Sequence, residues 1–196
     1  MPNQNFKQEL KKIKEEVLSC RKCSLYKTRT YPVIGEGNHQ AKIMFIGEAP
    51  GAQEDKTGRP FCGAAGKILD ELLDSVRIKR EEIYITNILK DRPPENRKPK
   101  KEEIKACTSY LEKQIEIIKP EVICTLGNYS TVFIMEKYGL KNQIQGISKI
   151  HGKIFEVKNL FQKIKIIPLY HPAVVTYNIN MKETLKKDFK ILEKFK

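Results

Sequence analysis

A short apolar stretch, residues 41–46, runs directly into a long polar loop with several glycines and prolines, residues 47–63. The apolar stretch has the length of a buried strand, and residues 64–76 after the loop have helical periodicity. In open α/β sheets, ligands bind where strands end and such loops begin. Strand-to-helix loops are usually about 2–6 residues long, so this length favours a binding site over an ordinary solvated connection.

The rest of the chain continues the alternation of strands and helices. Strands are expected at residues 42–47, 83–87, 122–126 and 165–169, a short β-ribbon at 154–157, and helices at 5–19, 64–76, 101–118, 128–137 and 181–195. This alternation predicts a mainly parallel sheet that is covered on both faces. We therefore expect an α/β protein, a three-layer α/β/α fold with a four-stranded, mainly parallel central sheet. The length suits a single domain over residues 1–196.

The charge balance indicates what this chain binds. Lys and Arg number 37 against 24 Asp and Glu, which gives a net charge of +13. Such an excess favours a polyanionic partner, nucleic acid before membrane, over the alternative of a lysine-rich thermophile surface. No apolar run approaches the roughly 20 residues of a membrane span, and no apolar signal core precedes the first helix. We expect a cytoplasmic protein without membrane contact.

Polar residues follow the carboxyl ends of several predicted strands. The loop that begins at Gly47 follows one strand, Asn87 ends another, and His171 comes directly after a third. Because right-handed crossovers place these ends at one edge of the sheet, the residues can converge on one pocket, with Phe61 as an apolar wall. An amide, an imidazole and an aromatic face suit a planar heterocycle. The alternatives are that Asn87 caps a turn, His171 braces a turn and Phe61 belongs to the core.

Three motifs resemble, in order, those of the family 4 uracil-DNA glycosylases. They are GEAPGAQEDKTGRPF from residue 47, ITN with KxRPPENR from residue 85, and LYHPA from residue 169. The resemblance covers residues 18–190 and implies the fold of that family. It also implies that the chain removes uracil from single- or double-stranded DNA by flipping the base out of the stack, which leaves an abasic site.

The resemblance also implies roles for single residues. Phe61 stacks on the flipped uracil, and Asn87 pairs with the base edge that distinguishes uracil from cytosine. His171 donates to uracil O2 as negative charge develops on the leaving base. The remaining pocket residues belong to the first motif: Gly47, Ala49 and Gly51.

The residue that activates water stays open. The better-known family of uracil glycosylases keeps an aspartate at the place where Ala49 stands in this chain. Glu48 and Glu54 are therefore equal candidates, as the catalytic base, as a residue that positions water, or as braces for the loop.

DNA contacts outside the pocket are expected from two segments. The basic, proline-rich loop suits phosphates, and the apolar residues after the HPA motif stand where relatives place a wedge that fills the gap left by the base. The candidates are Arg92, Arg97, Lys98, Tyr170, Val174 and Val175, with Tyr177 nearby. A solvated basic loop and core packing are the alternatives.

Five cysteines point to metal or cluster ligation, because an odd number in a cytosolic chain argues against a disulfide framework. The resemblance implies a [4Fe-4S] cluster on four cysteines. Cys20, Cys23 and Cys107 match three of them, and Asp91 occupies the place of the fourth. We expect Asp91 to be the fourth ligand of a structural cluster that ties residues 1–25 to the 91–107 loop.

Other arrangements of this site stay open. The cluster could hold three irons, Cys62 or Cys124 could substitute for the missing ligand, or a Cys₃Asp set could bind zinc. Cys124 falls in the middle of a predicted strand and is expected to be buried and inert.

Two rival functions remain compatible with the sequence. One is a glycosylase with another base preference, such as hypoxanthine, and the other is a non-catalytic iron–sulfur protein that binds damaged DNA. We expect a monomer. Contacts with a replication clamp or with repair proteins are plausible for such an enzyme, although no motif for them is evident.

Overall fold

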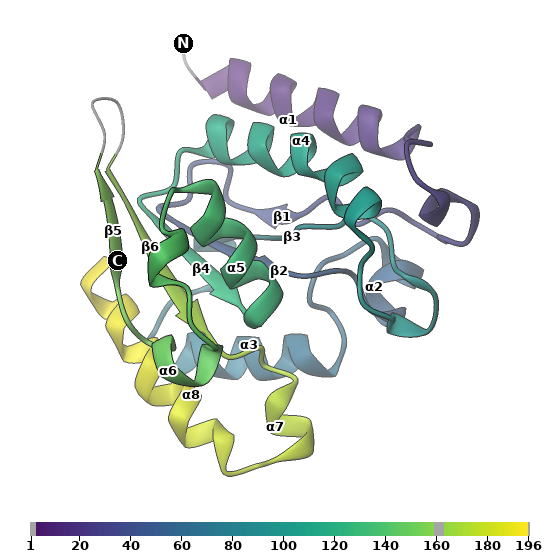
Figure 1. The fold of residues 1–196 in the computed structure, drawn as a ribbon. Helices are drawn as coiled ribbons and strands as arrows, with labels where there is room; N and C mark the ends of the chain where they lie inside the picture. Colours follow the sequence, from purple (N-terminus) through teal and green to yellow (C-terminus); the bar gives the residue numbers. More distant parts are fainter. Residues whose placement is uncertain (1–2, 159–162, 196) are drawn as a thin grey trace.

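A computed structural model describes residues 3–158 and 163–195 of the chain, so the ends of the predicted domain at residues 1 and 196 lie outside the described part. One six-stranded sheet runs through the molecule in the order β1-β3-β2-β4-β6-β5 (Figure 1). The strands are β1 (Glu36–Gly37), β2 (Ile43–Gly47), β3 (Tyr84–Asn87), β4 (Val122–Leu126), β5 (Phe155–Lys158) and β6 (Lys163–Leu169). The helices are α1 (Asn3–Leu18), α2 (Ala52–Thr57), α3 (Ala64–Ser75), α4 (Lys101–Ile118), α5 (Asn128–Lys137), α6 (Ile147–Ile150), α7 (Val174–Tyr177) and α8 (Met181–Phe189).

The central strands β3, β2, β4 and β6 are parallel, which confirms the predicted α/β class and its mainly parallel sheet. The sheet is wider than the four strands expected, because β1 pairs antiparallel with β3 and β5 pairs antiparallel with β6 at the two edges. β1 spans only two residues, too few for a periodic pattern. β5 corresponds to the predicted ribbon at residues 154–157, moved by one residue.

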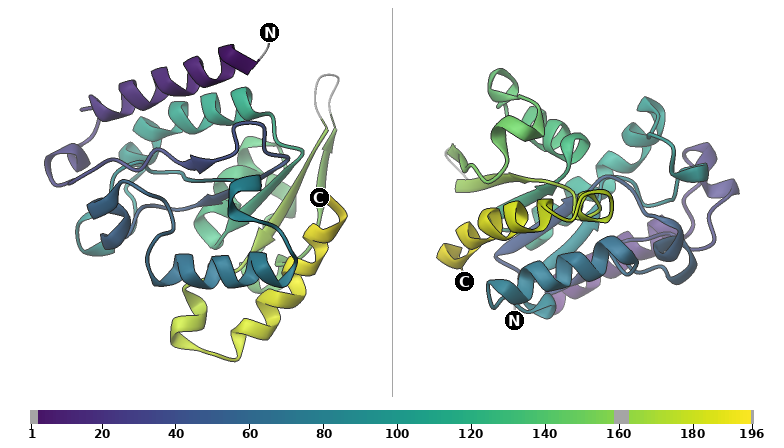
Figure 2. Two further views of the ribbon diagram at one scale, coloured as in Figure 1. Left: turned by 180° about the vertical axis from the view of Figure 1, so that it is seen from behind. Right: turned by 90° about the horizontal axis from the view of Figure 1, so that it is seen from below.

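Helices cover both faces of the sheet (Figures 1 and 2). α3 and α8 pack on one face, against Phe45 and the other strand side chains that point to that face. α4 and α5 cover the other face, and α1 lies outside α4. The two faces alternate along each strand as the pleat requires: Phe45 belongs to the first core, while Met44 and Ile46 belong to the second. No helix within the described ranges has both the length and the apolar character to cross a membrane.

The carboxyl ends of the parallel strands meet at one edge. Gly47 at the end of β2 is paired in register with Asn87 at the end of β3, and Leu126 of β4 with Leu169 of β6. The 47–63 loop leaves this edge and contains α2, a short helix that sequence periodicity missed. α2 begins after Gly51 and ends at Gly58, whose φ of 70° is the left-handed conformation that favours glycine at a helix end.

Candidate active site

The amide of Asn87 is buried and has an unused acceptor. Asn87 is 1% exposed, and its Oδ1 is the one buried side-chain nitrogen or oxygen without a hydrogen-bond partner in residues 3–158 and 163–195. A Cβ built on Gly47 would overlap this oxygen and the ring of Phe61. The Asn87 amide and the Phe61 ring therefore occupy the space that a side chain at residue 47 would fill. An unmade hydrogen bond of a buried group costs about 1–3 kcal/mol, so the amide suits a ligand that supplies an N–H.

Phe61 reaches this space from a strained backbone. Its φ is 47°, in the left-handed region that costs a residue with a side chain roughly 1–3 kcal/mol. Its ring is 5% exposed, and its centroid lies 5.6 Å from that of His171. Gly66 in α3 makes room for the turn, because a Cβ at that position would overlap the Phe61 carbonyl. Phe61 also belongs to the first core, where packing alone does not require a strained backbone.

Two charged side chains hold the backbone on either side of Phe61. Glu54 Oε1 accepts hydrogen bonds from the N–H groups of residues 62 and 63, each at 2.9 Å. Arg80 Nη2 donates to the carbonyl of Pro60 at 2.6 Å. Of the three roles left open for Glu54, these contacts are those of a brace. Arg80 was not among the sequence candidates, because it lies 20 residues from Pro60 and no local pattern links the two.

His171 presents a neutral N–H donor. Its Nδ1 accepts a hydrogen bond from the backbone N–H of Ala173 at 3.2 Å, so the proton of the neutral ring belongs on Nε2. Burial lowers the pKa of His171 to about 4, against an opposing effect of the Glu54 charge. Gly127, with a φ of 93°, turns the chain directly beside the imidazole. The ring is therefore neutral at physiological pH and fixed in one tautomer.

Glu48 is the other candidate carboxylate in the first motif. Burial raises its pKa, and the charge of Lys98 opposes that shift. Its carboxylate forms no hydrogen bond with any side chain or backbone group in the described part of the chain. It therefore differs from Glu54, whose carboxylate already binds two backbone groups.

The other two small residues of the first motif, Ala49 and Gly51, contact groups other than Asn87 and Phe61. The Ala49 side chain packs on a cluster formed by Leu25, Leu89 and Cys107. Gly51 lies against the Glu54 carboxylate, so a side chain there would displace the brace. Of the three motif residues expected to line the pocket, Gly47 is the one that faces Asn87 and Phe61.

The basic loop after β3 is partly used for its own structure. Arg97 forms a two-bond ion pair with Glu103, at 2.9 and 2.6 Å, and the Glu103 side chain is fully buried. The Arg97 guanidinium lowers the pKa of Glu103. Arg92 donates to Asn96, and exposed Lys98 lies over the ring of Tyr129. Arg97 therefore stabilises the start of α4, whereas Lys98 is accessible to a phosphate.

The valines after the HPA motif turn inward. Val175 is 7% exposed, and Val174 packs against the same core, because α7 directs both toward α3 and α8. The ring of Tyr170 lies against that of His151, with centroids 4.6 Å apart and the planes tilted by 39°. The apolar side chains exposed beside this segment are Tyr177, at 90%, and Ile179, at 68%.

The four predicted metal ligands interact electrostatically: the charges of Asp91 and Cys20 add to the burial that raises the pKa of Cys23, and those of Asp91 and Cys23 add to the burial that raises the pKa of Cys107. Both oxygens of Asp91 accept hydrogen bonds from Arg29 Nη1, at 3.0 and 3.1 Å. Cys23 packs beside buried Cys107, whereas Cys20 packs against a different core cluster. Within the residues described, no group of three or more His, Cys, Asp or Glu side chains could hold a metal ion.

The other two cysteines do not complete the set. The Cys62 thiol lies 3.1 Å from the hydroxyl of Thr57, in the 47–63 loop. Cys124 lies in β4, fully buried, and burial raises its pKa, as expected for an inert core thiol.

Arg29 ties α1 to the 91–107 loop. Besides its contact with Asp91, its guanidinium donates to the carbonyls of Val17, at 3.3 Å, and Leu18, at 2.6 Å. These are the last carbonyls of α1, which have no partner inside the helix. The Arg29 and Asp91 side chains are 11% and 6% exposed. The ion pair thus connects α1 to the loop at the place where the sequence predicts the cluster.

Arg29→Met should destabilise the fold by about 3–5 kcal/mol, because it leaves the Asp91 carboxylate buried without its partner. Urea unfolding measures this loss, with iron and zinc quantified in the same sample. Lys113→Met is the matched control, because the Lys113–Glu16 pair also joins α1 to α4 but is exposed. It should cost less than about 1 kcal/mol. An equally small loss for Arg29→Met, in protein that carries iron or zinc, would show that metal makes the connection and that the ion pair does not.

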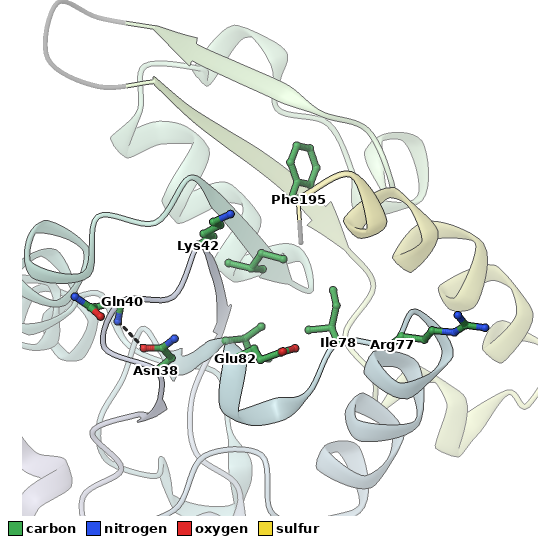
Figure 3. Close-up of a pocket in the computed structure, with 9 residues that line it drawn as sticks. Asn38, Gln40, Lys42, Arg77, Ile78, Glu82 and Phe195 are labelled. Atoms are coloured by element: carbon green, nitrogen blue, oxygen red, sulfur yellow. Dashed lines mark hydrogen bonds between the residues drawn. The ribbon is translucent and has the colours of Figure 1, made fainter.

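A cavity of about 300 Å³ lies at the opposite edge of the sheet (Figure 3). It opens at the amino ends of β2 and β3, where Lys42, Ile78 and Glu82 line it. It shares no lining residue with Asn87, Phe61 or His171 and is separate from the candidate active site.

The comparisons with known proteins agree with one another. Residues 34–195 match the family model of the uracil DNA glycosylase superfamily. A type-4 uracil-DNA glycosylase of Sulfurisphaera tokodaii is 49% identical over 92% of this chain and 82% of its own length. The enzyme of Archaeoglobus fulgidus is 48% identical over 93% of this chain and 91% of its own length. The enzyme of Thermotoga maritima is 45% identical over 85% of this chain and 82% of its own length. The chain therefore belongs to the uracil-DNA glycosylase superfamily, and within it to the type-4 enzymes.

Proposed function

We propose that this glycosylase hydrolyses the N-glycosidic bond of uracil in DNA in the pocket between Gly47, Phe61, Asn87 and His171. The observation that carries the proposal is the unpartnered Oδ1 of Asn87, buried opposite the Phe61 ring. Uracil offers an N–H at N3 and a carbonyl at C4, which an amide can pair with at once. Cytosine carries an acceptor and an amino group there, so each contact would meet a group of the wrong kind and leave polar groups unpaired.

Phe61 supplies the stacking face for the flipped base. Its ring stands beside both the Asn87 amide and the His171 imidazole, which supports a planar ligand between them. The braces from Glu54 and Arg80 hold this ring in place before the base arrives, so little ordering is left for the binding step.

His171 stabilises the leaving group. As the bond to the sugar breaks, the electron pair stays with the base and negative charge gathers on O2. A neutral imidazole with its proton on Nε2 donates a hydrogen bond to that oxygen without transferring the proton. Because the ring is neutral before the reaction, the donor is ready at physiological pH.

Glu48 positions the attacking water, and Glu54 braces the loop. The raised pKa and unpaired carboxylate of Glu48 support its role near the reacting sugar. The two backbone hydrogen bonds of Glu54 support the structural role.

Glutamine substitutions separate these two roles. Glu54→Gln keeps an acceptor oxygen for both backbone N–H groups, so the excision rate should stay within about 10-fold of wild type. Glu48→Gln removes the charge that orients water and should cost about 10²-fold or more. Single-turnover kinetics on a uracil oligonucleotide measure both rates. If Glu54→Gln were the more damaging change, the assignment of the two carboxylates would be reversed.

The DNA strand runs across the carboxyl edge of the sheet. The net charge of +13 and exposed Lys98 support phosphate contacts there. Two exposed apolar side chains follow His171 within the next turns of the chain, Tyr177 and Ile179. They are suited to fill the gap that the flipped base leaves in the DNA.

The base range is tested by excision from oligonucleotides that carry uracil, hypoxanthine or a thymine mismatch. The proposed pocket predicts abasic sites from uracil at a rate well above the other two. Faster release of hypoxanthine would favour the rival glycosylase. Tight binding of uracil DNA without any abasic product, at stoichiometric protein, would favour a non-catalytic binding protein.

A further inference from the structure

A buried lysine lies directly behind the amide that faces the pocket. Lys90 is 1% exposed. Its ammonium donates to the Thr86 hydroxyl at 2.7 Å, to the main-chain carbonyl of Asn87 at 2.8 Å, and to Gln114 Oε1 at 2.8 Å. An ammonium group has three donors, so the whole donor capacity of Lys90 is used within this network.

The partners of Lys90 are themselves anchored. Gln114, in α4, donates through Nε2 to the carbonyl of Ile34 at 2.8 Å and to the Tyr84 hydroxyl at 3.0 Å. The Thr86 hydroxyl donates to the same Ile34 carbonyl at 2.9 Å. The network therefore joins the end of β3 to α4 and to the segment before β1. Every buried polar side chain in it has a partner, in contrast to Asn87 Oδ1.

The main chain around Asn87 is held on both sides. Its carbonyl accepts from Lys90, and the N–H groups of Ile88 and Leu89 donate to the carbonyls of Gly47 and Glu48, at 3.0 Å each. With these groups fixed, the direction of the Asn87 side chain is set before any base binds.

A lysine is a costly residue to place at this position for packing alone. Burying an ammonium group is unfavourable unless all of its hydrogen bonds are made, and the three acceptors here are neutral oxygens. Methionine would fill similar space without that cost, so the hydrogen bonds are what the lysine contributes.

We propose that Lys90 is a positioning residue for base recognition. Through the Asn87 carbonyl, Thr86 and Gln114, it holds the end of β3 so that the Asn87 amide faces the flipped base. Lys90 does not touch the base. The inference rests on the proposed role of Asn87, and its test must separate a failure of one from a failure of the other.

A double-mutant cycle makes that separation. Lys90→Met should lower the single-turnover excision rate by about 10²-fold, the scale of a misplacement of roughly 1 Å at a reacting group. The affinity for uracil DNA, measured by fluorescence anisotropy, should stay near wild type. In an Asn87→Ala background, Lys90→Met should cost less than about 2-fold, because the residue through which it acts is already gone.

Two further variants separate a specific loss of excision rate from a general loss of stability. Gln114→Met keeps Lys90 and removes one of its three acceptors, so the same cycle tests the network from its other side. Ile78→Val removes a buried methyl group beside the cavity at the opposite edge of the sheet, away from the candidate active site. It should lower the melting temperature and leave the excision rate unchanged.

Two results would overturn the inference while leaving Asn87 in its role. One is a wild-type rate for Lys90→Met, and the other is an equal loss from Lys90→Met in both backgrounds. A wild-type rate for Asn87→Ala alone would overturn the role of Asn87 itself, and the positioning role of Lys90 with it.

Discussion

Asn87→Asp is expected to lower the single-turnover rate of uracil excision by about 10³-fold. A carboxylate has no N–H to offer the carbonyl at C4 of uracil, and its charge repels the anion that forms as the base leaves. The substituted group is buried at the same position, 1% exposed, where no cation pairs with the Asn87 side chain in the part of the chain described.

Asn38→Asp is the matched control for this change. Asn38 is exposed at the opposite edge of the sheet, and its Oδ1 accepts from the N–H of Gln40 at 2.9 Å. Aspartate keeps that acceptor, so the control should excise uracil at the wild-type rate. Melting temperatures of both variants show whether the loss at Asn87 is one of chemistry or of folding. A folded Asn87→Asp protein with the wild-type rate would refute the proposed reading of the base edge.

His171→Ala is the second change with a large expected effect, a loss of about 10²–10³ in rate. Alanine removes the N–H donor from the oxygen on which charge develops. His171→Gln restores an N–H donor in a side chain of similar reach, and should recover part of the rate. Equal rates for the alanine and glutamine variants would mean that the donor itself does not contribute.

The pH behaviour of His171 follows from its lowered pKa. The unfolded imidazole titrates near 6.5 and the folded one near 4. The unfolded chain therefore binds the proton first as the pH falls, so the stability from this group is present above about pH 6.5 and is lost between there and about pH 4. Nitrogen-15 NMR of the imidazole should show a neutral ring with its proton on Nε2 down to about pH 5. Titration of this ring near pH 6.5 would contradict its role as a neutral donor.

The central part of the fold was predictable because it depends on local patterns. Each parallel strand is an apolar run of strand length, and α3 and α4 have helical periodicity between clear boundaries. β1 and α2 were not predictable in this way. Both are short, and each has a tertiary partner: β1 pairs with β3, and buried Asp55 of α2 accepts two hydrogen bonds from Thr30.

The candidate site shows the same division. Gly47, Asn87 and His171 were placed at one edge because parallel strands must end together, and the structure brings them together with Phe61. The supporting contacts around the site join residues that are far apart in the sequence, so no local pattern predicts them. Arg29 contacts Asp91 across 62 positions, and Lys90 contacts Gln114 across 24.

The inward turn of Val175 was also beyond the sequence pattern. An apolar residue after the HPA motif suits either a wedge or the core, and only its packing against α3 and α8 decides between them. For Lys90, the one available signal was a lysine after the apolar pair Ile88 and Leu89, next to a strand end. That signal does not identify the acceptors.

The most direct measurement compares wild type with Asn87→Asp on a duplex that carries one uracil, with abasic sites detected by alkaline strand cleavage. We expect cleavage at the uracil position after one turnover of the wild-type protein, and a rate about 10³-fold lower for the variant. Uracil DNA that stays uncleaved after treatment with stoichiometric wild-type protein would refute the proposed activity. Equal rates for the two proteins would refute the proposed role of Asn87.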